Sequence, residues 1–213
     1  MKKRKIVFGL GPGRCGSASL ALLLNSQKNA LVSHELFPII PWNTADPYNA
    51  QFRWEQFHHQ THLFDLVGDV AMYYLPWVEF FMSSLTQLPH LINGFDFKFI
   101  VMHRDIEEIV QSFLVKFKRQ NNNPLQNHND PSITVNEWDA CFPKHDDMPL
   151  EEAIRMYCSD YYKVSEELQK KYPDNVKIFD VESLNSKEGV MSILAFVGIE
   201  NPVAITGIKR NES

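Results

Sequence analysis

The chain has 213 residues, of which 44% are hydrophobic and 22% are charged, and its formal net charge at pH 7 is -5. This balance is that of a folded protein, and it excludes a chain that is disordered along most of its length. The negative charge argues against a nucleic-acid binder that works through a broad basic surface, although a few cations can still line a pocket for a phosphorylated ligand. The length fits one α/β domain, so we expect residues 1–213 to form a single domain.

The cysteines and the start of the chain bear on its location. Cys15, Cys141 and Cys158 are odd in number and far apart, which is not the pattern of a disulfide framework and suits a reducing compartment. The apolar run from Ile6 to Leu10 is too short for a signal peptide or a membrane span. We therefore expect a cytoplasmic protein with no membrane span.

Short apolar runs alternate along the chain with longer amphipathic stretches, which is the pattern of an α/β domain with a parallel sheet. The predicted strands cover residues 5–9, 30–33, 64–67, 98–103 and 176–181. The predicted helices cover residues 16–25, 74–85, 106–119, 150–171 and 187–196. We expect a three-layer α/β fold, in which helices flank a central parallel sheet of about five strands.

Residues 120–149 break this alternation, because they are rich in Asn, Asp, His and Pro and contain only scattered apolar residues. A long irregular segment inside a compact domain is typical of a lid or a binding loop. A solvated insertion without a role remains an equal alternative.

A glycine-rich segment follows the first predicted strand and opens the first predicted helix. It consists of Gly11, Pro12, Gly13, Arg14, Cys15, Gly16, Ser17, Ala18 and Ser19. Glycines let the backbone turn so that successive amides point into one concavity, and the helix N-terminus adds a partial positive charge. With an arginine and hydroxyl groups added, the segment predicts an anion-binding site.

Other phosphate-binding loops fit this segment less well. A triphosphate loop of the form GxxxxGK[ST] needs a lysine where this chain has Ser17. The dinucleotide fingerprint GxGxxG is met by Gly11, Gly13 and Gly16, and Glu35 lies near the distance expected of a ribose-binding acid. An NAD- or FAD-dependent oxidoreductase therefore remains an alternative.

A second candidate segment follows the fourth predicted strand. Arg104 leaves the strand at the sheet edge where ligands of open α/β folds gather, and a guanidinium binds phosphate in a bidentate manner. Ser112 comes two helical turns later and can share a ligand-facing side with the start of that helix. An ordinary surface ion pair and a helix serine are the alternative interpretation of these two residues.

Together these two segments, residues 11–19 and 99–114, resemble the sulfotransferase superfamily, whose fold is a variant of the P-loop nucleotide-binding α/β fold. The first resembles the loop that holds the 5′-phosphosulfate, in the arginine-containing form of carbohydrate and heparan-type sulfotransferases. The second resembles the segment that grips the 3′-phosphate, with Arg104 and Ser112 at the family's arginine and serine positions. The resemblance implies an enzyme that takes a sulfuryl group from 3′-phosphoadenosine 5′-phosphosulfate and leaves 3′,5′-adenosine diphosphate.

The resemblance also implies roles for individual residues. Residues 11–19, Arg104 and Ser112 would bind the donor, and Arg14 would stabilise the leaving phosphate without delivering a proton. Carboxylate bases follow the second strand in heparan-type relatives, which makes Glu35 the first candidate base and His34 the second. Asp69 is a third and less favoured candidate for the base. Lys209, Arg210 and Asn211 also resemble the family, but more weakly than the two segments do.

No metal is implied, and the acceptor is a small molecule or a carbohydrate whose identity the sequence does not give. His58, His59 and His62 are predicted to form a polar helix face beside the acceptor groove, and not a metal site. A third hypothesis is a nucleotide-binding protein that keeps the fold without catalysis.

Overall fold

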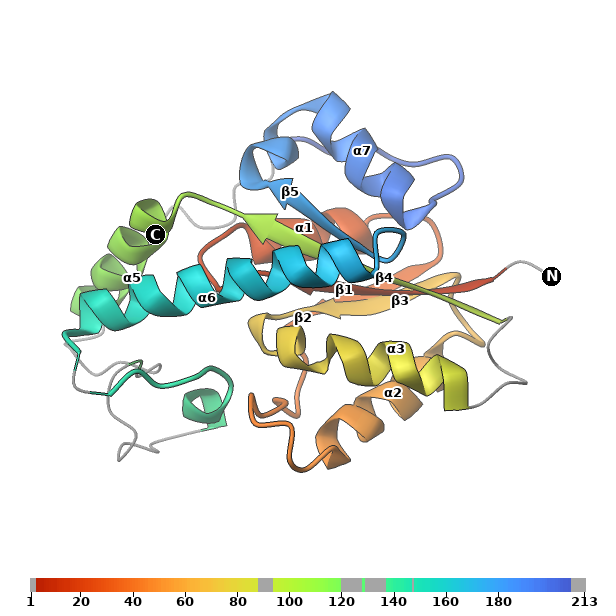
Figure 1. The fold of residues 1–213 in the computed structure, drawn as a ribbon. Helices are drawn as coiled ribbons and strands as arrows, with labels where there is room; N and C mark the ends of the chain where they lie inside the picture. Colours follow the sequence, from red (N-terminus) through yellow and green to blue (C-terminus); the bar gives the residue numbers. More distant parts are fainter. Residues whose placement is uncertain (1–2, 88–93, 120–127, 129–136, 147, 208–213) are drawn as a thin grey trace.

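The computed structural model describes residues 3–87, 94–119, 128, 137–146 and 148–207. Within these ranges, five parallel strands form one sheet: β1 (Arg4–Leu10), β2 (Ala30–His34), β3 (Leu66–Val70), β4 (Phe95–His103) and β5 (Val176–Asp180). Their order is β2-β3-β1-β4-β5, which places β1 in the centre (Figure 1). The predicted α/β fold with a parallel central sheet of five strands is confirmed.

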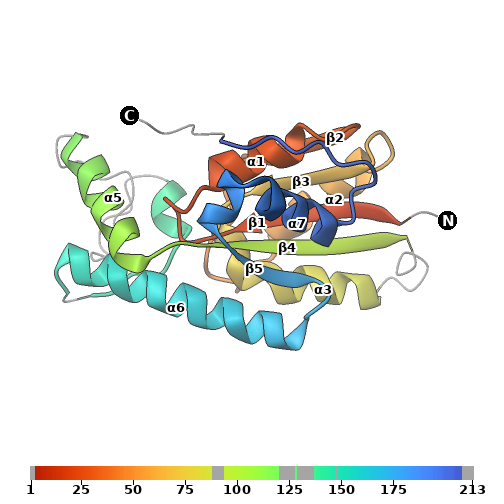
Figure 2. The same cartoon turned by 90° about the horizontal axis from the view of Figure 1, so that it is seen from above.

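Helices lie on both faces of this sheet, as Figures 1 and 2 show. The helices α1 (Ser17–Asn25) and α7 (Lys187–Val197) cover one face. The helices α2 (Tyr48–Gln60) and α3 (Val78–Gln87) cover the other, and α6 (Leu150–Lys171) lies beside α3 and along β5. The connection from β1 to β2 crosses the sheet in one direction, and the later connections cross it in the other. Because connections between parallel strands are right-handed, α1 lies on one face of the sheet and α2 and α3 lie on the other.

The core between the sheet and α2 with α3 is aromatic. Phe97 and Phe99 are two residues apart on β4, so both point to the same face, where they stack against Phe8 of β1. Phe57 of α2 and Phe81 of α3 complete the cluster, and all five side chains are fully buried. Burial of rings of this size supplies a large share of the hydrophobic stabilisation and fixes the position of the strands.

The sequence prediction is wrong at three places in the first half of the chain. It places a helix face only at the histidines from His58 to His62, whereas α2 has thirteen residues and begins at Tyr48. It ends the third strand at residue 67, whereas β3 continues to Val70. It begins one helix at residue 74, whereas a 3₁₀ helix η1 (Met72–Trp77) containing Pro76 precedes α3.

The remaining elements lie at the carboxyl ends of the strands. The helix α5 (Ile106–Arg119) follows β4 and packs against α6, and the 3₁₀ helix η3 (Val181–Asn185) follows β5. No helix in the described part of the chain combines the length and apolar character needed to cross a membrane.

Most of the segment 120–149 lies outside the described residues, so the lid remains a prediction. Its described part contains a short 3₁₀ helix, η2 (Glu137–Ala140), followed by Cys141 and Phe142, which are buried. The Trp42 amide donates a hydrogen bond to the Ala140 carbonyl at 2.7 Å. This part of the segment therefore packs against the body of the domain.

Candidate functional site

The strand order identifies one position on the sheet as the expected binding crevice. From β1 the chain crosses to β2 on one side, whereas β4 lies on the other side of β1 and leads onward to β5. Ligands of open α/β sheets bind at such a switch point, outside the carboxyl ends of the strands. The loop after β1 and Arg104 after β4 both lie at this point.

The loop after β1 adopts a sharply turned backbone before α1 begins. Gly13 and Gly16 have φ angles of 91° and 89°, in the left-handed region that favours glycine. An added Cβ at Gly16 would lie 2.9 Å from Val181 Cγ2, so a larger residue would also collide with η3. The first turn of α1 contains no acidic residue, which leaves the positive end of the helix dipole without a carboxylate from that turn.

The structure brings Arg14, Ser112 and Arg104 into direct contact. Arg14 Nε donates a hydrogen bond to Ser112 Oγ at 2.8 Å. Arg104 Nη1 donates to the Arg14 carbonyl oxygen at 2.9 Å, and its Nε donates to Glu108 Oε2 at 2.8 Å. The two segments that resemble donor-binding segments are therefore in contact, and we name Arg14, Ser112 and Arg104 the arginine cluster.

The two candidate bases lie at the end of β2, beside the start of α1. His34 is the last residue of β2, and its Nε2 lies 3.0 Å from Ser17 Oγ in hydrogen-bonding geometry. Glu35 follows directly, and its carboxylate lies 4.0 Å from His34 Nδ1. About one third of each side chain is exposed, 30% for His34 and 35% for Glu35, so both are accessible to a ligand.

Backbone strain selects two of the predicted site residues. Among the described residues, four that are not glycine have positive φ angles, and two of these are asparagines, which tolerate this conformation. The other two are Arg14 and Glu35, each with a φ of 55°. Such conformations cost about 1–3 kcal/mol and concentrate at functional sites, so this observation supports both residues independently of the motif.

A buried ion pair holds the segment on which Glu35 lies. Arg53 of α2 and Asp69 of β3 are fully buried, and Arg53 Nη1 lies 3.3 Å from Asp69 Oδ2. The same carboxylate oxygen accepts a hydrogen bond from the Leu36 amide at 3.0 Å. Arg53 Nη2 and the Tyr73 hydroxyl both donate to the Leu36 carbonyl, so the residue after Glu35 is fixed on both sides.

This arrangement gives Asp69 a role other than that of a base. Its Oδ2 atom also accepts a hydrogen bond from the Tyr74 hydroxyl at 2.8 Å, and the side chain has no exposed surface. A carboxylate enclosed in this way cannot reach a substrate proton. Asp69 helps to hold the segment that contains Glu35. The interpretation of Asp69 as the base is therefore not favoured.

The remaining loop residues have structural positions. Cys15 and Pro12 are buried, whereas Ala18 and Ser19 lie half-buried in the first turn of α1. Burial raises the pKa of the Cys15 thiol to about 11, so this cysteine is not a nucleophile at neutral pH. The Gly11 amide donates to the Tyr161 hydroxyl of α6 at 2.8 Å, which anchors the loop where it leaves β1. Tyr161 gave no signal in the sequence, because its contact joins residues that are far apart in the chain.

The histidines of α2 lie at the other end of the sheet. The ring of His58 is 5.4 Å from that of His62 and 5.6 Å from that of Phe95, the first residue of β4. The predicted polar face beside the acceptor groove is therefore wrong in its location, because the end of α2 lies beside the amino ends of the strands. In the described ranges, no group of three or more His, Cys, Asp or Glu side chains is arranged to hold a metal ion.

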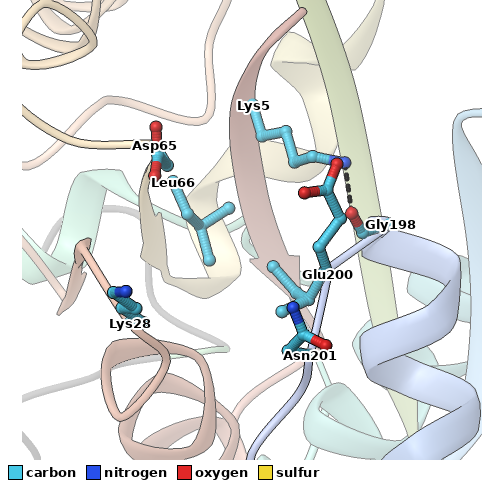
Figure 3. A pocket seen from close by; sticks show the side chains of 8 residues that line it. Lys5, Lys28, Asp65, Leu66, Gly198, Glu200 and Asn201 are labelled. Carbon is cyan, nitrogen blue, oxygen red and sulfur yellow. Dashed lines mark hydrogen bonds between the residues drawn. The ribbon is translucent and has the colours of Figure 1, made fainter. Parts of the chain in front are cut away.

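A pocket of about 210 Å³ also lies at the amino end (Figure 3). Its charged lining consists of Lys5, Lys28, Asp65 and Glu200. The Lys5 amine donates hydrogen bonds to the Val197 and Gly198 carbonyls at the end of α7. This pocket is therefore separate from the arginine cluster, since the two lie at opposite ends of β1.

One further cation, Lys116, lies within electrostatic range of Arg14 and Glu35. It lies four residues after Ser112 on α5 and is half-buried. The spacing from Ser112 was available in the sequence, but the approach of α5 to the glycine-rich loop was not. Lys209, Arg210 and Asn211 lie outside the described residues.

No protein-family model and no curated protein matches the chain. A function for the chain is therefore inferred from the resemblance of the two segments and from the geometry of the site.

Proposed function

We propose that the protein is a sulfotransferase that uses 3′-phosphoadenosine 5′-phosphosulfate as its donor. The observation that carries the proposal is the direct contact of Arg14 with Ser112 and of Arg104 with the loop backbone, at the switch point of the sheet. The resemblance assigns these residues to the 5′ and 3′ ends of one nucleotide. A single doubly phosphorylated ligand can reach both only if they share one crevice.

The chemistry that this proposal requires is an in-line displacement at sulfur. The acceptor oxygen forms a bond to sulfur, the bond from sulfur to the bridging oxygen breaks, and its electron pair leaves with the nucleotide. The acceptor proton passes to a base, for which Glu35 is the first candidate and His34 the second. Arg14 and the N-terminus of α1 stabilise the charge that grows on the leaving phosphate.

The dinucleotide alternative is disfavoured by the topology. In the dinucleotide-binding fold the second strand lies next to the first, and its acidic residue reaches the ribose of a ligand bound at the first loop. Here β3 lies between β1 and β2, so Glu35 extends from a strand that does not neighbour β1. That alternative also assigns no role to Arg104 or Ser112.

A nucleotide-binding protein without catalysis remains the second candidate. Two features of Glu35 favour catalysis: its left-handed backbone conformation and the hydrogen bonds from the buried ion pair that hold the next residue, Leu36. Backbone strain of this kind concentrates at residues that take part in function. Transfer of labelled sulfate to an acceptor separates the two functions. We propose that the acceptor is a hydroxyl or an amine of a small molecule or a carbohydrate. We also propose that the protein acts in the cytoplasm.

Binding of 3′,5′-adenosine diphosphate, measured by isothermal titration calorimetry, tests the proposal. Arg14→Ala and Arg104→Ala should each weaken binding about 10- to 100-fold, the equivalent of about 1.5–3 kcal/mol for a hydrogen bond between charged groups. Arg4→Ala, at the opposite end of β1, is the matched control and should leave Kd unchanged. Unaltered affinity in Arg104→Ala, or binding of NAD in place of this nucleotide, would contradict the proposal.

A further inference from the structure

The face of α5 that includes Ser112 and Phe113 contacts the glycine-rich loop. Ser112 accepts the hydrogen bond from Arg14, and the neighbouring ring of Phe113 lies against Gly13, where an added Cβ would be 3.1 Å from Phe113 Cζ. Residues four apart on a helix are neighbours on its surface. Lys116 is therefore the next side chain on the face that covers the loop.

Lys116 interacts electrostatically with one residue from each half of the proposed site. Burial, together with the positive charge of Arg14, lowers the pKa of Lys116, whereas the negative charge of Glu35 acts in the opposite direction. The amine is thus within electrostatic range of both the loop arginine and the candidate base. The proposed mechanism assigns Arg14 to the leaving phosphate and Glu35 to the acceptor, so the sulfuryl group would move between the two oxygens that these residues serve.

We infer that Lys116 is a further catalytic residue, whose ammonium group contacts the oxygens of the sulfuryl group during transfer. This inference rests on the proposed function and deepens it. The resemblance covers residues 11–19 and 99–114, so it does not include Lys116. Its assignment comes from its position on α5 and from its two charged neighbours.

The reaction explains why a second cation is needed. As the acceptor oxygen attacks, negative charge is spread over the sulfuryl oxygens and the bridging oxygen that leaves with the nucleotide. The hydrogen bond from Arg14 Nε to Ser112 holds the Arg14 guanidinium on the donor side of the proposed site. A lysine amine is a compact charge with three donors, and it can follow the sulfuryl group from the leaving oxygen to the acceptor oxygen.

The test compares two nucleotides that differ only in the sulfuryl group. Wild-type protein, Lys116→Ala and Lys116→Arg are titrated with 3′,5′-adenosine diphosphate and with 3′-phosphoadenosine 5′-phosphosulfate. Lys118→Ala, an exposed lysine on the same helix, is the matched control. Release of labelled sulfate from the donor is followed in parallel, because it needs no knowledge of the acceptor.

We expect Lys116→Ala to bind 3′,5′-adenosine diphosphate within about twofold of wild type and the donor about tenfold more weakly, with sulfate release about 100-fold slower. Lys116→Arg should recover donor binding, and Lys118→Ala should match wild type in all three measurements. Equal weakening of both nucleotides, or no change in either donor binding or sulfate release, would overturn the inference while leaving the proposed function in place. Failure of the wild-type protein to bind either nucleotide would instead reject the proposed function and the inference with it.

Discussion

Basic side chains lie at both ends of the sheet. At the amino end of the sheet they lie beside helix C-termini, whereas at the carboxyl end they lie beside helix N-termini. At the amino end, Lys5 donates to the last carbonyls of α7, and Lys98 donates to the Asp174 carbonyl, which follows α6. At the carboxyl end, Arg14 precedes α1 and Arg104 precedes α5. Cations are favoured at helix C-termini and disfavoured at helix N-termini, by about 0.3–1 kcal/mol each.

This difference distinguishes cations that contact backbone carbonyls at helix C-termini from the two arginines of the proposed donor site. The lysines of the amino end neutralise backbone carbonyls that the fold itself exposes. The arginine cluster adds positive charge to helix ends that are already positive, and the acidic residues of the first turn of α5 offset this only at α5. An anion bound between these groups would remove the repulsion, which is the physical reason to expect an anionic ligand at this end.

Removing one partner from the buried ion pair at the carboxyl end should have the largest effect. Arg53→Met leaves the Asp69 carboxylate buried and unpaired, so we expect a loss of about 3–5 kcal/mol in the free energy of unfolding. Asp96→Asn breaks the partly exposed pair with Lys98 nearer the amino end and should cost at most about 1 kcal/mol. Urea denaturation measures both, and similar losses would show that the two ion pairs do not differ in their support of the fold.

A buried histidine at the carboxyl end should contribute to the pH dependence of stability. His128 is fully buried against Phe142, and burial lowers its pKa to about 3. The unfolded chain binds a proton near pH 6.5, so the stability due to neutral His128 is complete above that pH and falls as the pH drops toward 3.

Between pH 7 and pH 5 this effect amounts to about 2 kcal/mol. His128→Phe should remove that part of the pH dependence in urea denaturation. An identical pH profile for His128→Phe and wild type would show that His128 does not titrate between the folded and unfolded states.

A pair of glycines gives the smallest expected effect and the sharpest contrast. Gly16 and Gly198 both have positive φ angles, so alanine at either position should cost about 1–2 kcal/mol of stability. The added Cβ meets Val181 at Gly16 and the flexible Lys5 amine at Gly198. Only Gly16→Ala distorts the proposed anion loop, so only this variant should weaken binding of 3′,5′-adenosine diphosphate in calorimetry. Equal loss of binding in Gly198→Ala would place the ligand elsewhere.

The sequence predicts the regular parts of the fold well, because their hydrophobic period is clear. The helices at 106–119 and 150–171 have the predicted bounds, and all five strands exist. The third strand was predicted too short because Asp69 is a charged residue at a strand position, and the arginine that makes its burial possible comes from α2. Pro76 explains the 3₁₀ helix before α3, since proline removes a helical hydrogen bond.

The candidate site was only partly predictable. Spacing identified Arg104 and Ser112, and the glycines identified the loop that contains Arg14. No local pattern indicates that α5 lies over that loop or that Glu35 has a left-handed backbone, because both depend on packing between distant segments. The histidines of α2 show the same limit, since the sequence gave their spacing but not the end of the sheet at which they lie.

The burial of all three cysteines makes the native protein well suited to chemical labelling. Burial raises the pKa of Cys15 to about 11 and that of Cys158 to about 12, and it raises the pKa of the Cys141 thiol as well. At pH 8 only about one Cys15 thiol in a thousand is ionised, and alkylating reagents attack the thiolate. A fluorophore attached to one engineered surface cysteine, such as Phe37→Cys two residues beyond Glu35, would therefore report ligand binding without modification of the native thiols.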